Sequence, residues 1–198
     1  MECLIGIQFD NFILLACDGN AGRSIISMKK DEDKIYGLSD KLALAICGES
    51  GSAVRFAEFI SQNVQLYKMT NGYDMTPDAA AHFTRRQLAD SVRTSGAFNV
   101  NLLLGGMNKS NEPKLFFMDH LGSLVQVPFA IHGYGSYMTL SILDRKYDPA
   151  MTKEEGLKLL QECIREIQMR FVYNLSTFKV KIIDAEGITS LADIHIDG

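Results

Sequence analysis

The chain has 198 residues, 46% hydrophobic and 22% charged, which is the composition of one globular domain spanning residues 1–198. Its 20 basic and 24 acidic residues give a net charge of −4, which argues against nucleic acid as a partner. The longest apolar runs are too short to cross a membrane, which takes roughly 20 residues, and the amino terminus lacks the features of a signal peptide. We therefore expect no membrane partner and a location in the cytoplasm and nucleus.

The first fifty residues predict two β-hairpins. Residues 4–9 and 12–17 flank a turn at Asp10-Asn11, and residues 34–38 and 42–47 flank Ser39-Asp40. The runs 12–17 and 42–47 are continuously apolar rather than alternating, which is typical of sheets that are covered on both faces.

Two helices and further strands follow. Apolar residues recur at spacings of three and four from 52 to 67 (Val54, Ala57, Ile60, Val64, Tyr67), and Asn71-Gly72 ends that pattern. Thr76-Pro77 predicts the start of a second helix, whose apolar stripe is Ala80, Phe83, Leu88 and Val92. Strands are predicted at 99–104, 115–118 and 124–129.

The last third of the chain predicts a third helix over 135–145 and a fourth beginning at Thr152. Thr152 and Glu155 have the spacing of a capping box. Phe178, Val180 and Ile182 then alternate with Lys179 and Lys181, which predicts a closing strand with one solvated face. The blocks of strands and helix pairs indicate an α+β fold with helices covering antiparallel sheets.

The four cysteines, Cys3, Cys17, Cys47 and Cys163, lie far apart in the sequence. The first three stand in apolar runs, and no CxxC or HExxH spacing occurs. Buried free thiols are therefore expected, rather than disulfides or a metal site, and no cofactor is indicated.

Four stretches of the chain carry a family resemblance: residues 4–8 (LIGIQ), 14–18 (LLACD), 49–90 and 132–164. Together they resemble the β subunits of the 20S proteasome, and among these the members regarded as lacking peptidase activity. The resemblance implies the four-layer αββα sandwich of the N-terminal nucleophile hydrolases, in which helices flank two antiparallel sheets.

The family's nucleophile is a threonine at the mature amino terminus, activated with help from its own α-amine. Met1 takes that place here, Glu2 follows it, and no threonine occurs before Thr70. Active members are cut after a glycine that precedes the threonine, whereas this chain has no Gly-Thr pair. The expectation is that processing cannot supply the nucleophile.

Three other positions match the family's site. Asp18 and Lys34 match its aspartate and lysine, and Gly48 matches the glycine whose N–H serves the oxyanion. The structural alternatives are an Asp–Lys ion pair across neighbouring strands that only fixes the fold, and a tight turn that needs glycine.

Elsewhere the family's pattern is lost. Tyr134 stands in place of the serine in a Gly-Ser-Gly sequence, and residues 171–175, with Phe171 and Asn174, replace an Asp-x-x-Ser-Gly sequence. Cys3 is expected to be a strand residue rather than a nucleophile. None of His82, His120, His132 and His195 has a triad-like setting, and His132 is expected to precede a turn before the third helix.

The resemblance implies a non-catalytic structural subunit of the 20S core particle, the chamber for ATP- and ubiquitin-dependent protein degradation. Its partners would be other β subunits of the same ring, α-ring subunits and β subunits of the opposite ring, in a hetero-oligomer of 28 subunits. Two rival hypotheses remain open: a self-contained N-terminal nucleophile peptidase of the threonine type, and an isolated binding module.

Overall fold

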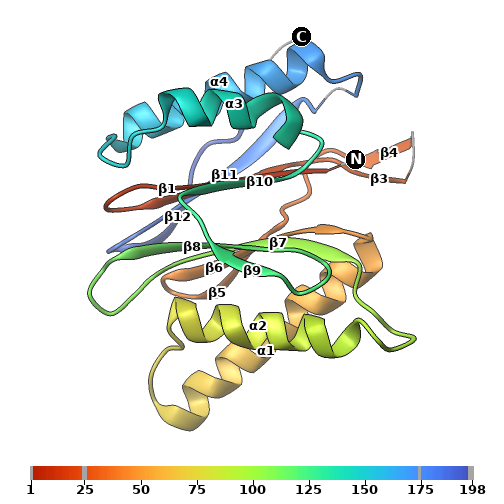
Figure 1. Cartoon of the computed structure of the whole chain (residues 1–198), viewed down its shortest axis with the longest axis vertical. Helices are drawn as coiled ribbons and strands as arrows, with labels where there is room; N and C mark the ends of the chain where they lie inside the picture. Colours follow the sequence, from red (N-terminus) through yellow and green to blue (C-terminus); the bar gives the residue numbers. More distant parts are fainter. Residues whose placement is uncertain (1, 24–25, 174, 196–198) are drawn as a thin grey trace.

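Two antiparallel sheets are stacked face to face between two pairs of helices in the computed structural model of the chain (Figure 1). The structure describes residues 2–23, 26–173 and 175–195. One sheet is covered by α3 (Ser136–Lys146) and α4 (Lys153–Arg170), and the other by α1 (Ser50–Asn71) and α2 (Pro77–Ser91). The expected four-layer αββα sandwich is confirmed.

The first sheet joins the two ends of the chain. Its strand order is β10-β1-β2-β11-β12, with β13 also paired to β11. The strands are β1 (Cys3–Gln8), β2 (Ile13–Asp18), β10 (Phe129–Gly133), β11 (Thr177–Asp184), β12 (Gly187–Ser190) and β13 (Ile194–His195). The predicted first hairpin is confirmed, because β1 pairs with β2 in antiparallel register.

The second sheet is built from consecutive strands in the order β5-β6-β7-β8-β9. These are β5 (Ile35–Ser39), β6 (Leu42–Gly48), β7 (Val100–Met107), β8 (Pro113–Met118) and β9 (Leu124–Gln126). The pairing of β5 with β6 confirms the predicted second hairpin. A separate two-stranded ribbon, β3 (Ala21–Arg23) and β4 (Ile26–Lys29), lies between the two hairpins in the sequence.

Three apolar clusters fill the spaces between the four layers. Phe9, Leu160 and Phe178 lie in the cluster between the first sheet and its helices. Leu103 belongs to the cluster between the sheets, and Phe56 to the one beneath α1 and α2. The continuously apolar strands β2 and β6 contribute to clusters on both of their faces, as their composition predicted. All four cysteines are free and buried.

The predicted helix ends are confirmed by their caps. The Thr76 side chain accepts a hydrogen bond from Ala79 N–H at the start of α2, and Thr152 and Glu155 form a complete capping box on α4. Gly72, in the left-handed region at φ 76°, ends α1. Hydrogen bonds of this kind satisfy backbone groups that a helix end leaves unpaired.

The strand predicted over 124–129 is wrong, because the chain changes sheets within it. β9 ends at Gln126, and β10 begins at Phe129 in the other sheet (Figure 1). Pro128 lies in the crossing, where its missing N–H removes a donor that a continuous strand would use. Its carbonyl accepts a hydrogen bond from Gln8 N–H at 2.8 Å.

The solvated face predicted for the closing strand is also wrong. The Lys181 side chain is 15% exposed, and its ammonium pairs with Asp33 at 2.8 Å and donates to the Ile35 carbonyl at 2.6 Å. Lys179 pairs with Asp193 at 3.0 Å. These lysines therefore connect β11 to neighbouring segments.

The apolar stripe of α1 differs from the predicted one. Ala53 and Phe56 are buried, whereas Val54, which was predicted to belong to the stripe, is 39% exposed.

Candidate functional site

Asp18 and Lys34 form an ion pair that joins the two sheets. Asp18 ends β2 in the first sheet, and Lys34 directly precedes β5 in the second. The Lys34 Nζ lies 2.9 Å from Asp18 Oδ2, and the two side chains are 7% and 0% exposed. The expected ion pair is present, but it spans the gap between the sheets rather than neighbouring strands of one sheet.

Further groups surround this pair, including a second carboxylate from Glu2. Asp18 also accepts hydrogen bonds from the backbone N–H groups of Cys3 at 2.7 Å and Asn20 at 3.1 Å. Burial raises the pKa of Asp18, and the charge of Lys34 opposes that effect. Burial lowers the pKa of Lys34, but the charges of Asp18 and Glu2 outweigh it, so the pKa is raised overall. Lys34 and the backbone donors favour the ionised form of Asp18, whereas burial and the nearby charge of Glu2 oppose it.

Gly48 occupies a position that only glycine fits. It ends β6 with φ 141°, and a Cβ atom there would lie 2.3 Å from the carbonyl oxygen of Asn99. Residues other than glycine rarely adopt this backbone conformation. The geometry of the turn that leads from β6 into α1 therefore requires glycine at position 48, independently of any role of its N–H group.

Glu2 is the site residue that the sequence patterns did not indicate. Its Oε2 accepts a hydrogen bond from Gly48 N–H at 2.6 Å, and its Oε1 lies 3.2 Å from Lys34 Nζ. The carboxylate thus bridges two of the three positions that match the family's site. Only its place next to the expected nucleophile position could have drawn attention to it, since an acidic residue before a strand is ordinarily solvated.

These groups line a cleft of about 830 Å³. Glu2, Lys34 and Gly48 stand on one part of its wall, and Tyr173 and Met28 also contribute. Within the described part of the chain, Ser50 is the one serine that lines this cleft, and no threonine does. The cleft therefore has charged side chains and backbone donors, but Ser50 provides its one serine or threonine hydroxyl within the described residues.

The positions where the family's support is replaced lie partly together. The rings of Tyr134 and Phe171 stack with centroids 5.8 Å apart, and Tyr134 remains 56% exposed. Tyr134 follows Gly133, which pairs with Cys3 at the start of β1. An aromatic contact thus stands where the resemblance predicts a serine hydroxyl and an aspartate carboxylate. The two other replaced positions, Met1 and Asn174, lie outside the described residues.

The four cysteines and His132 are buried, whereas His82, His120 and His195 are exposed. Burial and the nearby charge of Asp18 raise the pKa of Cys3. Burial raises the pKa values of Cys17, Cys47 and Cys163 to about 12. His132 stacks on Phe117, its Nε2 lies 3.1 Å from the Leu102 carbonyl oxygen, and burial lowers its pKa to about 4.

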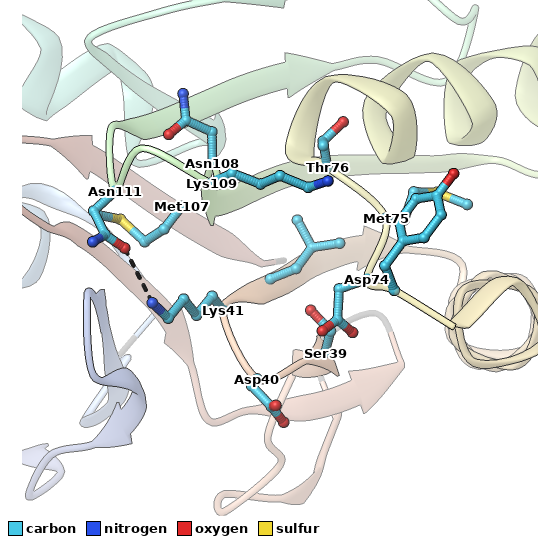
Figure 2. Close-up of a pocket in the computed structure, with 12 residues that line it drawn as sticks. Ser39, Asp40, Lys41, Asp74, Met75, Thr76, Met107, Asn108, Lys109 and Asn111 are labelled. Carbon is cyan, nitrogen blue, oxygen red and sulfur yellow. Dashed lines mark hydrogen bonds between the residues drawn. The ribbon is translucent and has the colours of Figure 1, made fainter. Parts of the chain in front are cut away.

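A second hollow, of about 360 Å³, lies between the β5–β6 turn, the α1–α2 loop and the β7–β8 loop (Figure 2). Lys41 donates to Asn111 Oδ1 at 3.1 Å across one side, and Lys109 and Asp74 also line it. Basic and acidic groups alternate there without converging on one point. This hollow therefore has the character of a polar surface between loops.

Neither a metal centre nor a membrane span emerges from residues 2–23, 26–173 and 175–195. No three His, Cys, Asp or Glu side chains in these ranges are grouped so that they could hold a metal ion. No helix in them combines the length and apolar character needed to cross a membrane.

Comparisons with known proteins show the family of this chain. A family model described as "Proteasome subunit" matches residues 2–183. The chain is 38% identical to "Proteasome subunit beta type-4" of Saccharomyces cerevisiae, over 98% of this chain and 99% of that protein. It is 40% identical to "Probable proteasome subunit beta type-4" of Neurospora crassa, over 100% and 96%. It is 38% identical to "Proteasome subunit beta type-2-A" of Arabidopsis thaliana, over 97% and 94%. The chain belongs to the proteasome subunit family.

Proposed function

We propose that this chain is a β-type subunit of the 20S core particle that completes the proteolytic chamber without hydrolysing peptides itself. The full-length similarity to β-type subunits supports its place in the particle. Its function is then structural: it fills one position of a ring and holds the catalytic neighbours in register.

One observation carries the non-catalytic part of this proposal. An ammonium group has three hydrogens to donate. The Nζ of Lys34 has three acceptors, at 2.9 Å on Asp18, 2.8 Å on the Asn20 carbonyl and 3.2 Å on Glu2. The three hydrogens of Lys34 are thus engaged, and two carboxylates offset the charge that would lower the pKa of a nucleophile at the chain end. A lysine held in this way supports the fold rather than a reaction.

The partners follow from the same proposal. We expect other β subunits beside this chain in its ring, α-ring subunits on one side and β subunits of the opposite ring on the other, in a particle of 28 subunits. We also propose a location in the cytoplasm and the nucleus. The exposed side chains of Tyr137 (87%) and Met169 (75%) on α3 and α4 are consistent with burial against neighbouring subunits.

Native purification tests this assignment to the particle. The chain should elute in a large assembly, and mass spectrometry should identify both α-type and β-type subunits with it. Elution as a monomer would favour an isolated binding module instead.

An electrophilic probe that acylates a terminal threonine tests the lack of activity. It should label the catalytic subunits of the same particle, which serve as the internal control, and leave this chain unmodified. Labelling of this chain, together with a mature terminus trimmed to Thr, Ser or Cys, would establish the self-contained peptidase.

A further inference from the structure

We infer that Lys34 and Gly48 form a carboxylate-binding site whose resident ligand is Glu2 of the same chain. The two oxygens of Glu2 have separate partners: Oε1 contacts the Lys34 ammonium at 3.2 Å, and Oε2 accepts from Gly48 N–H at 2.6 Å. This arrangement matches the planar, two-oxygen shape of a carboxylate. The site is thus occupied from within the chain, and peptides that enter the cleft find neither donor available.

The two donors are held in place by parts of the fold that do not depend on Glu2. Asp18 and the Asn20 carbonyl fix the Lys34 ammonium, whose side chain is 7% exposed. Gly48 is fixed by its backbone conformation and by the turn, where Glu49 N–H donates to the Asn99 carbonyl at 3.2 Å. The site should therefore keep its shape when the Glu2 carboxylate is removed.

Lys34 supplies the attraction for an anion at this point, with Glu2 on its cleft side and Asp18 on its buried side. Asp18 offsets part of that attraction, so the two donors, rather than net charge, select a carboxylate. Glu2 approaches from the cleft, and its side chain is 26% exposed. Hydrogen bonds to a charged acceptor are the strong ones, and they are stronger in a partly desolvated cleft. The chemical class of ligand that fits is a small monocarboxylate.

Replacement of Glu2 by alanine gives a direct test on the full-length chain. Glu2→Ala removes the carboxylate and one methylene group, and acetate has those two carbons. Without added ligand, Tm should fall by on the order of 5 °C, because two charge-assisted contacts are lost. Sodium acetate should raise the Tm of this variant in a saturable manner, relative to sodium chloride at the same ionic strength.

Two matched variants separate binding from general salt effects. Glu2→Gln keeps the shape but not the charge, and because its amide fills the space, acetate should not raise its Tm. Glu49→Ala removes a carboxylate that lines the same cleft and that, among the residues the structure describes, accepts a hydrogen bond only from the Ser52 hydroxyl, at 3.1 Å. Acetate should change the Tm of Glu49→Ala no more than it changes the Tm of the wild type.

Hydrogen exchange in the assembled particle provides a second readout if the isolated variant does not fold. The peptide that contains Gly48 should exchange slowly in the wild type, faster in Glu2→Ala, and slowly again with acetate. The inference is wrong if acetate acts equally on Glu2→Ala, Glu2→Gln and the wild type, or if Glu2→Ala changes neither Tm nor exchange at Gly48.

Discussion

The Oδ1 atom of Asp18 accepts a hydrogen bond from the backbone N–H of Cys3 at 2.7 Å. The two residues lie on neighbouring strands, where the ladder between β1 and β2 runs out. Through its other oxygen Asp18 contacts Lys34, so one carboxylate connects the start of β1, the end of β2 and the start of the second sheet.

This connection predicts strong coupling between Asp18 and Lys34. Lys34→Met should lower the free energy of unfolding by about 3–5 kcal/mol, since a buried charge loses its partner. Adding Asp18→Asn should cost less than it does in the wild type, because no unpaired charge then remains. Chemical denaturation of the four proteins gives the coupling. Lys29→Met, at an exposed pair with Glu32, is the control, and strictly additive costs would contradict the prediction.

A new terminal threonine should not be enough to create activity. Met1→Thr, exposed by a cleavable leader, should restore no peptide hydrolysis, because Lys34 has no hydrogen to spare and Tyr134 and Phe171 stand where a supporting serine and aspartate are expected. The assay uses particles whose own catalytic threonines are substituted. Particles with one intact catalytic subunit show that the assay works, and hydrolysis above background by the variant would refute the prediction.

His132 should make the fold sensitive to acid. Burial lowers its pKa to about 4, whereas the unfolded chain binds a proton near the ordinary value of about 6.5. The neutral form therefore stabilises the fold above pH 6.5, and up to about 3 kcal/mol is lost as the pH falls to about 4. Denaturation at several pH values should show a smaller loss in His132→Gln. The exposed His120→Gln is the matched control, and identical profiles for wild type and His132→Gln would contradict this account.

Gly156 should not tolerate a side chain. A Cβ atom there would lie 2.8 Å from the ring of Phe9, which is buried in the core beneath α4. Gly156→Ala should therefore lower the free energy of unfolding by about 1–3 kcal/mol through overpacking. Gly51→Ala is the control, because nothing lies within 4 Å of its Cβ, and alanine there should be neutral or stabilising by up to about 1 kcal/mol. Equal effects at the two positions would be evidence against the packing argument.

The four thiols should be inert in the folded protein. All four cysteines are at most 4% exposed, and burial raises the pKa of each. Maleimide should modify them only when the chain unfolds, which mass spectrometry can follow with and without denaturant. Fast modification of the native chain would contradict the buried positions of these side chains.

The sequence predicted the fold well wherever local patterns were strong. Residue spacings within short segments predicted the two hairpins, the four helices and the capping box of Thr152. The short strands β3, β4, β12 and β13 did not, because two to four residues carry no period and depend on their partners. Pro128 gave the only local sign that the chain crosses between sheets.

The sequence predicted several residues of the site but not how they are arranged in space. Asp18, Lys34 and Gly48 were singled out by resemblance, and the structure places Lys34 and Gly48 on one cleft, with Asp18 buried behind Lys34. The contact between Glu2 and Gly48 links residues 46 positions apart, and no pattern in either segment indicates it. Such contacts arise from the stacking of the sheets, which is a property of the whole fold.

The strand order of the two sheets has a consequence for synthesis on the ribosome. Every strand of the second sheet is available once residue 126 has been made, whereas β2 must wait for β11, which begins at Thr177. Until then the edge of β2 has unpaired backbone groups, and unpaired edges invite association with other chains. For an interval during synthesis, all strands of the second sheet are therefore present while the first sheet still lacks β11. Protection of the β2 edge is most needed during this interval.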